Sequence, residues 1–173
     1  VGPSHSTCVT ENGALLSWGS ANSGKLGFGK SGRNSVKMRP EVFPTPTVVS
    51  GLSLCFVKQV SCGASFTLAL TNSGVFSWGS GDGGRLGHGD NKDRYQPTEI
   101  EHLSDDVILH VECGQWHACA IAKTVTRKIG NVLYTWGNGF HGQLGHGEMR
   151  KQSSIPKIVN GLCEMEVQPK HVS

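Results

Sequence analysis

The stretch Trp136-Gly-Asn-Gly-Phe-His-Gly-Gln-Leu-Gly-His-Gly147 has two further close copies in the chain, from Trp78 to Gly89 and from Trp18 to Gly29. Each copy begins with Trp-Gly, carries a glycine six places after the Trp and ends with Leu-Gly-x-Gly. A motif repeated at fixed internal spacing indicates a repeat architecture. The structural repeat positions are Trp18, Trp78, Trp136, Gly29, Gly89 and Gly147.

The sequence around the motif extends each unit to about fifty residues. Gly63 and Gly114, upstream of the motif, lie 51 positions apart, and so do Pro46 and Pro97 downstream of it. This period predicts three tandem units that together span the chain. Their approximate bounds are 1–61, 62–112 and 113–173.

Short apolar runs separated by turn signals fill each unit. Residues 66–70 and 117–121 read as inner strands, whereas 75–78 and 132–136 read as third strands that end on the repeated Trp. The 24 glycines, near twice the average share of about 7%, fall at the repeated turns. Because no segment has a convincing helical period, the pattern predicts an all-β fold.

The units resemble the repeats of the regulator-of-chromosome-condensation family. That family's pattern is similar to C-G-x-x-H-[ST]-x-x-[LVA], followed by W-G-x-G-x-x-G-Q-L-G-x-G and a proline. The departures are local: Val1 replaces the cysteine, Phe66 the histidine and Ala21 a glycine. The resemblance implies a seven-bladed β-propeller of four-stranded blades. Propellers close with about four to eight blades, so we expect these three blades to be a slice of a larger propeller.

Glycine-rich and acidic segments are the first candidates for chemical sites. Residues 79–84 and 137–142 both match G-x-G-x-x-G, but that dinucleotide motif requires a following helix, and here a proline-containing segment follows. Asp82, Asp90 and Asp93 do not have the spacing of a calcium loop, so we expect solvated carboxylates. The sequence therefore predicts turns in these segments, with no cofactor.

The eight histidines contain no H-E-x-x-H pair, and His88 and His146 both lie in the repeated Leu-Gly-His-Gly turn. A structural hydrogen bond from each turn histidine is favoured over a zinc site. There is no G-x-S-x-G nucleophile motif either. We therefore expect no metal and no enzymatic activity.

Features that are not repeated are the candidates for binding. Trp116 occurs in the third unit alone, where we align Pro3 and Ala64 of the other units, and an exposed Trp is a good anchor for a partner protein. A family branch that senses ultraviolet light has a repeated Gly-Trp-Arg-His-Thr motif, but here the Arg is missing. Two inserted loops carry the basic candidates, which are Lys30, Arg33, Lys37, Arg39, Lys123, Arg127 and Lys128. Their charge suits an acidic protein surface or nucleic-acid phosphates, although the net charge is only +3.

These observations favour a non-enzymatic protein–protein interaction scaffold within a larger intracellular regulatory protein. The alternative is a guanine nucleotide exchange factor for a Ran-type small GTPase associated with chromatin, which is the function of the family's founding member. We expect no membrane contact, because no apolar run approaches the eighteen or so residues of a membrane span. The six cysteines include no C-x-x-C and read as reduced thiols of a cytoplasmic or nuclear protein. The edges of a three-blade slice would pair with the remaining blades or with a second copy.

Overall fold

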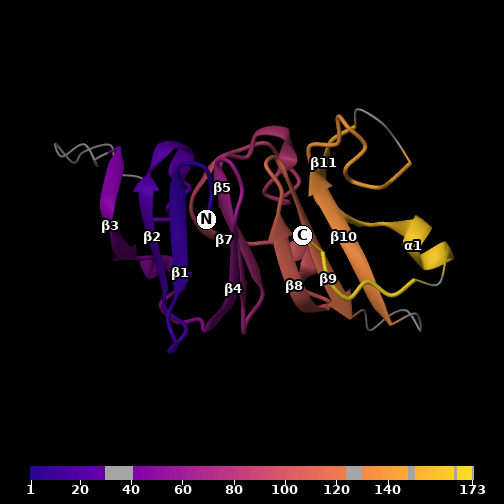
Figure 1. Cartoon of the computed structure of the whole chain (residues 1–173), viewed down its shortest axis with the longest axis horizontal. Coiled ribbons are helices and arrows are strands. Elements are labelled where there is room, and N and C mark those ends of the chain that lie inside the picture. Colours follow the sequence, from indigo (N-terminus) through magenta and orange to yellow (C-terminus); the bar gives the residue numbers. More distant parts are fainter. Residues whose placement is uncertain (30–40, 124–129, 148–150, 166, 173) are drawn as a thin grey trace.

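The computed structural model describes residues 1–29, 41–123, 130–147, 151–165 and 167–172. These residues form three antiparallel sheets that lie side by side (Figure 1). The first sheet consists of β1 (His5–Val9), β2 (Leu15–Ser20) and β3 (Val42–Val48). The second consists of β4 (Val57–Cys62), β5 (Phe66–Thr71), β6 (Val75–Gly79) and β7 (Arg94–Glu99). The third consists of β8 (Val107–Cys113), β9 (His117–Lys123), β10 (Asn131–Gly137) and β11 (Ser153–Ile158).

The predicted all-β class with propeller blades is confirmed. Within the described residues the second and third sheets have four strands each, while the first has three. Short 3-10 turns follow the strands at Asn22–Gly24, Ser50–Leu52, Asp82–Gly84 and Glu101–Leu103. One short α-helix, α1 (Asn160–Glu164), was not expected from the sequence.

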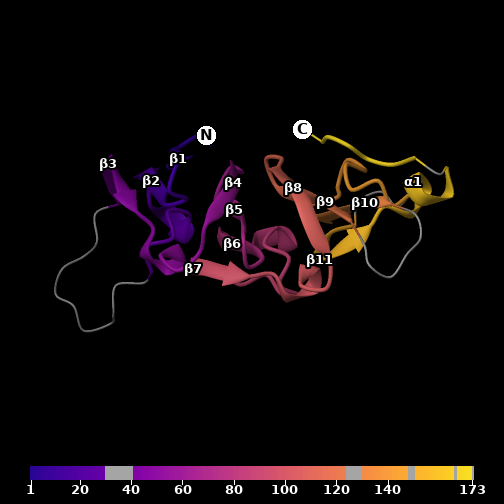
Figure 2. The same ribbon diagram turned by 90° about the horizontal axis from the view of Figure 1, so that it is seen from below.

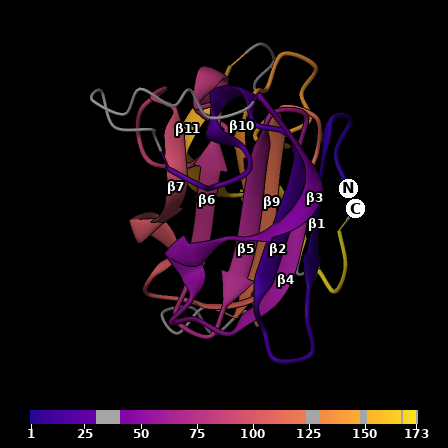
Figure 3. The same ribbon diagram turned by 90° about the vertical axis from the view of Figure 1, so that its left-hand side faces the viewer.

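The sheets are arranged around an arc. Seen from below, β4 and β8 face each other on its inner side and β7 lies on its outer side (Figure 2). The end-on view agrees, with β4 and both termini on one side and β7 and β11 on the other (Figure 3). The first strand of each four-stranded sheet therefore lines the inside of the arc.

The repeated Trp residues occupy the joints between sheets. Trp78 has 0% exposure and packs in a cluster with Leu15 and Val49 of the preceding unit, while Trp136 has 0% exposure and packs with Leu86 and Ile100. The predicted packing role is therefore confirmed for these two. Trp18 is only half-buried, because the described residues contain no sheet before the first one.

Each of the two buried indoles also makes a hydrogen bond across its joint. Trp78 Nε1 donates to the carbonyl of Lys25 at 2.9 Å, and Trp136 Nε1 donates to the carbonyl of Arg85 at 3.0 Å. The next turn glycine makes room for the indole: Gly87 has φ of +81°, and a Cβ there would lie 3.0 Å from Trp136 Nε1. This is the close backbone approach expected of a repeated glycine.

Side chains connect the inner strands. The Gln59 amide on β4 brackets Val111 of β8, since its Nε2 donates to the Val111 carbonyl at 2.8 Å and its Oε1 accepts from the Val111 N–H at 3.1 Å. The Ser61 hydroxyl accepts from the N–H of Cys113 at 3.0 Å. The second and third sheets are thus joined on the inside by side-chain-to-backbone bonds and farther out by the indole of Trp136.

Candidate functional site

Trp116 lies at the end of the third sheet where β9 begins. Its side chain is 42% exposed although its backbone is fixed, because its carbonyl accepts from the N–H of Asn138 at 2.9 Å. The equivalent bonds run from Ser20 to Ser4 and from Ser80 to Ser65. Trp116 is therefore equivalent to Ser4 and Ser65, and our alignment with Pro3 and Ala64 was wrong by one residue.

A second exposed aromatic belongs to the same end of the sheet. Phe140 is 55% exposed, and its N–H donates to the side-chain oxygen of Asn138 at 3.0 Å. Asn138 thus contacts both aromatic segments. On the other side of Trp116, the carbonyl of the exposed Gln115 accepts from the N–H of Ala64 at 3.1 Å, which ties the segment to the second sheet. We call Gln115, Trp116, Asn138 and Phe140 the Trp116 surface.

The Trp116 surface suits protein recognition in its composition and in its rigidity. An amphipathic Trp presents a large contact area with few rotatable bonds, and such residues dominate the energy of protein interfaces. Phe140, which replaces Asp82 and Asn22 of the other two motif copies, is an apolar neighbour that sequence reasoning did not select. The sequence could have indicated Phe140, because this position is aromatic in the third copy of the motif and polar in the other two.

The basic candidates do not lie beside Trp116 in the described part of the chain. Lys123 is exposed at the far end of β9, about 23 Å away at 3.3 Å per residue. Trp116 and Lys123 therefore lie at opposite ends of the third sheet. The remaining basic candidates lie outside the described residues: Lys30, Arg33, Lys37, Arg39, Arg127 and Lys128.

Two other cations are held in the scaffold. Arg85 is 6% exposed, and its guanidinium donates to Ser65 Oγ at 2.9 Å and to Asp82 Oδ2 at 2.8 Å. Lys25 is 5% exposed and its Nζ donates to Ser4 Oγ at 2.8 Å. Burial lowers the pKa of both side chains. Lys25 and Arg85 each stand directly before the motif Leu. They hold the turn whose backbone carbonyl accepts the hydrogen bond from the Trp of the following unit.

The turn histidines have the structural role predicted for them. His88 Nε2 lies 2.9 Å from Ser77 Oγ, and His146 Nε2 lies 3.1 Å from Thr135 Oγ1. Burial is the main cause that lowers the pKa of His88, which favours the neutral ring. Asp82 pairs with Arg85 while its own side chain remains 84% exposed, in keeping with the solvated carboxylate expected there. Residues 79–84 contain the end of β6 and the 3-10 turn Asp82–Gly84, where a turn was predicted in place of a nucleotide-binding helix.

The described residues contain no cluster of three or more His, Cys, Asp or Glu suited to a metal ion. All six cysteines lie in the described part of the chain as free thiols. Burial raises the pKa of Cys119 to about 12 and that of Cys113 well above its usual value. A thiol with so high a pKa is a poor nucleophile at neutral pH. No helix of the described residues has the length and apolar character needed to cross a bilayer.

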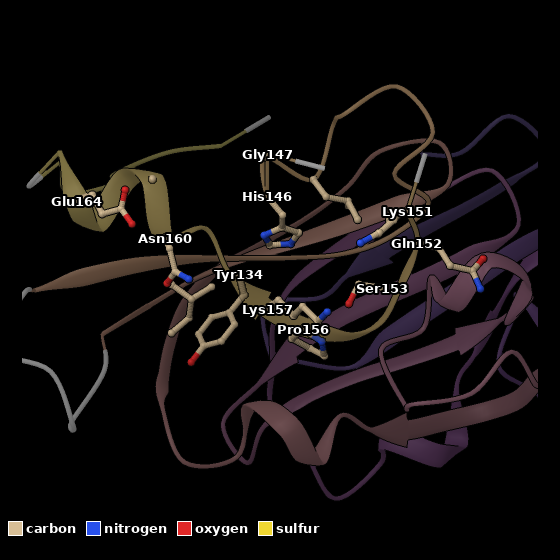
Figure 4. Close-up of a pocket in the computed structure, with 14 residues that line it drawn as sticks. Tyr134, His146, Gly147, Lys151, Gln152, Ser153, Pro156, Lys157, Asn160 and Glu164 are labelled. Carbon is tan, nitrogen blue, oxygen red and sulfur yellow. The ribbon is translucent and has the colours of Figure 1, made fainter. Parts of the chain in front are cut away.

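An open cavity of about 850 Å³ lies at the free edge of the third sheet. Figure 4 shows its walls: His146 and Gly147 of the last motif, Pro156 and Lys157 of β11, and residues of α1. Gly145 also lines it, at the motif position that receives an indole in the first two units. Gly145 in the cavity wall is thus the third copy of the glycine that borders an indole at Gly27 and Gly87.

Comparison with known proteins places these features in a family. The family model described as the regulator of chromosome condensation (RCC1) repeat matches residues 12–70, 72–121 and 131–170, which together are most of the chain. A shorter model of the same repeat matches residues 57–85. The matched repeats are offset from the sheets: the second match, 72–121, takes β6 and β7 from the second sheet and β8 and most of β9 from the third.

Among curated proteins, human E3 ubiquitin-protein ligase HERC2 is 33% identical over 171 residues, which is 95% of this chain and 3% of HERC2. The ultraviolet-B receptor UVR8 of Arabidopsis thaliana is 34% identical over 162 residues, 93% of this chain and 33% of that protein. This chain therefore spans a third or less of either relative.

Among solved structures, Prp20p from Saccharomyces cerevisiae superposes with a TM-score of 0.71 at 19% identity, covering 92% of this chain and 37% of Prp20p. That structure is described together with the binding of Prp20p to Gsp1p and histones. At this identity the likeness concerns the fold alone.

Proposed function

Because the chain belongs to the regulator of chromosome condensation (RCC1) repeat family, we propose that it is a protein–protein interaction scaffold whose partner binds the Trp116 surface. The observation that carries the proposal is the 42% exposed indole on a backbone fixed to Asn138. By contrast, the repeated Trp78 and Trp136 are buried in joints and the repeated Trp18 is half-buried. We further propose that these blades are a slice of a larger propeller in an intracellular regulatory protein.

The physical argument is one of preorganisation. The hydrogen bonds from Asn138 and Ala64 fix the backbone on both sides of the indole before a partner arrives. Because this backbone does not have to be ordered on binding, more of the contact energy of the indole is retained. No acid, base or metal is needed for this function.

Site-specific crosslinking tests the location of the partner. A photoreactive amino acid would be placed at position 116 in one variant and at position 123 in the other, in cells that express the protein. Because the two sites are the opposite ends of β9, the second variant is a matched control. We expect a discrete adduct from position 116 and not from position 123.

The partner found in that adduct then allows an affinity measurement. Truncation of an anchoring Trp typically costs about 2 kcal/mol or more, so Trp116→Ala should weaken binding by about thirtyfold, whereas Lys123→Ala should leave it unchanged. Equal adducts from both positions, or an unchanged affinity for Trp116→Ala, would reject the Trp116 surface as the contact.

A second candidate is guanine nucleotide exchange on a Ran-type small GTPase, with chromatin association. It is favoured by Prp20p, a protein of the same fold described with binding to Gsp1p and histones. Exchange of this kind works through protein contacts, so an absence of catalytic motifs does not oppose it. Release of a fluorescent nucleotide from the GTPase, with and without this protein, separates the two candidates: acceleration supports exchange, and an unchanged rate leaves the scaffold.

A further inference from the structure

We propose that Lys25 and Ser4 form a binding site for a carboxylate group, supplied by an aspartate or glutamate side chain of a partner protein. The site lies at the end of the first sheet that corresponds to the Trp116 end of the third sheet, because Ser4 and Trp116 are equivalent positions. It is separate from the Trp116 surface, and a partner bound to it would be additional to the one proposed above.

The cation of this site is buried without an acidic partner. Lys25 is 5% exposed. Among the described residues its ammonium has one hydrogen bond, to Ser4 Oγ at 2.8 Å, and takes part in no ion pair. A lysine is almost never so fully buried unless it is paired, because its ammonium loses hydration that only an opposite charge replaces. Lys25 therefore has both the charge and the spare N–H donors to bind an anion.

The second unit shows the same arrangement with a carboxylate in place. Arg85, which is equivalent to Lys25, is 6% exposed. Its guanidinium donates to Ser65 Oγ at 2.9 Å and to Asp82 Oδ2 at 2.8 Å. In the first unit the serine is retained, but Asn22 stands at the position of Asp82. The first unit thus keeps the cation and the hydroxyl and lacks the carboxylate.

The pKa shifts of the two cations differ in the same way. Burial lowers the pKa of Lys25, and no carboxylate of the described residues acts against this shift. Burial is also the main cause that lowers the pKa of Arg85, but there the charges of Asp82 and Asp93 oppose it. An anion beside Lys25 would favour its charged form as those carboxylates favour that of Arg85.

At the equivalent site the acid does not come from a neighbouring sheet. The second sheet lies between the other two (Figure 1) and packs against both of them through Trp78 and Trp136. Even so, the side-chain acceptors of Arg85 are Ser65 and Asp82 of its own unit. An adjoining blade is therefore not expected to supply the carboxylate that the first unit lacks.

The first unit contains few acidic residues of its own. Between Glu11 and Glu41 the sequence has five basic residues and no acidic one. Glu11 follows β1 at the end opposite to Ser4. Glu41 lies closer, since its carbonyl accepts from the N–H of Ala21 at 2.8 Å, but its side chain is exposed and forms no ion pair with any described residue. This excess of positive charge favours an acidic partner.

The site can be reached from solvent. Ser4 and Asn22 are both exposed, and the side chain of Asn22 makes no hydrogen bond to the described part of the chain. A carboxylate bound between them would accept from Lys25 Nζ, as Asp82 accepts from Arg85. The Ser4 hydroxyl, which accepts from Lys25, would donate its own hydrogen to the second carboxylate oxygen. Charge-assisted hydrogen bonds of this kind are about twice as strong as neutral ones.

Fluorescence anisotropy of a labelled hexaglutamate peptide, titrated with the protein at low salt, tests the site. We expect binding of hexaglutamate and none of hexaglutamine. Lys25→Gln should weaken binding about tenfold, because a hydrogen bond to a charged group is lost. The fold should accept this change, since Gln143 stands at the equivalent position of the third unit. Lys92→Gln removes an exposed lysine from the second unit and is the matched control, which should bind like the wild type.

Asn22→Asp gives a second test that needs no ligand. It places a carboxylate where Asp82 pairs with Arg85, so it should shift the unfolding equilibrium toward the folded state by about two- to fivefold. The gain should vanish when Lys25→Gln is also present, because the cation is then missing. The same variant should weaken the binding of hexaglutamate, since its own carboxylate occupies the site.

Three results would overturn the proposal. One is a lack of hexaglutamate binding, or equal binding by the wild type and a Lys25→Gln variant whose circular dichroism shows it to be folded. Another is an equal gain in stability from Asn22→Asp with and without Lys25. The third is displacement of the peptide by inorganic phosphate at far lower concentration than by acetate, which would assign the site to phosphate.

Discussion

The indole of Trp78 donates a 2.9 Å hydrogen bond to the backbone carbonyl of Lys25, 53 residues earlier in the chain. The carbonyl of Lys25 also accepts from the Thr67 hydroxyl at 2.9 Å. One peptide group of the first motif is thus held by two side chains of the second sheet. Each copy of the motif therefore contributes to two interfaces. Its turn accepts a hydrogen bond from the Trp of the following unit, and its own Trp donates one to the turn of the preceding unit.

Trp78→Ala should destabilise the folded chain by about 3 to 5 kcal/mol, because a fully buried indole and its hydrogen bond to Lys25 are lost. Trp18→Ala should cost clearly less, because Trp18 is only half-buried and makes no joint among the described residues. Urea unfolding followed by circular dichroism measures both variants. Equal losses for the two variants would contradict the assignment of Trp78 to the joint.

Gly87→Ala should destabilise the chain more than Gly145→Ala. Both glycines have positive φ, +81° and +71°, so each substitution incurs a backbone cost of about 1 to 2 kcal/mol. Only at Gly87 would the new Cβ also approach an indole, at 3.0 Å from Trp136 Nε1. The difference between the two unfolding free energies isolates the contact at the joint, and no difference would show that the glycine serves its turn alone.

His5 should make the fold sensitive to mild acid. Burial, assisted by the charge of Lys25, lowers the pKa of His5 from 6.5 to about 4, while its Nε2 lies 2.9 Å from Thr67 Oγ1. Between these two pKa values the unfolded state binds more protons than the folded state, so stability falls as the pH is lowered from about 6.5 to about 4. Phe66 stands at the same repeat position, which makes His5→Phe a natural control. Thermal melting across this pH range should show a shallower loss for His5→Phe than for wild type, and parallel curves would contradict the assignment.

Thiol labelling at neutral pH should divide the cysteines by their environment. Cys8 is exposed and should react first, whereas Cys119 is buried and its pKa is raised to about 12, so almost none of it is thiolate. Cys113 should be equally slow. Mass spectrometry after short exposure to a maleimide would locate the labels, and the same reaction in denaturant would supply the fully reactive reference. Fast labelling of Cys119 in the folded chain would contradict its placement.

The sequence predicted the strands closely because their signals are local. The apolar runs at 66–70 and 117–121 became β5 and β9, which extend one and two residues farther. The contacts between sheets could not be predicted in the same way. Gln59 brackets Val111 across 52 positions, and no local pattern indicates that pairing.

The candidate site was predicted only in part. Trp116 stood out as the one unrepeated Trp, but an alignment error of one residue obscured its equivalence to Ser65. Arg85 is charged and stands within the repeated motif, yet the fold leaves it only 6% exposed, with Ser65 and Asp82 as hydrogen-bond partners. The burial of Arg85 depends on contacts with neighbouring parts of the fold. The sequence of one repeat unit does not reveal those contacts.

The inner strand of each sheet precedes the segment at which the sequence repeats, so a cut between Ser61 and Cys62 and a second between Glu112 and Cys113 would remove one complete period. The shortened chain would keep its first turn and its last Trp, and Trp136 would meet the carbonyl of Lys25 in place of that of Arg85. Because Lys25 and Arg85 hold equivalent turns, neither cut leaves an unmatched surface. The architecture can therefore lose or gain whole units by recombination while every remaining junction stays compatible.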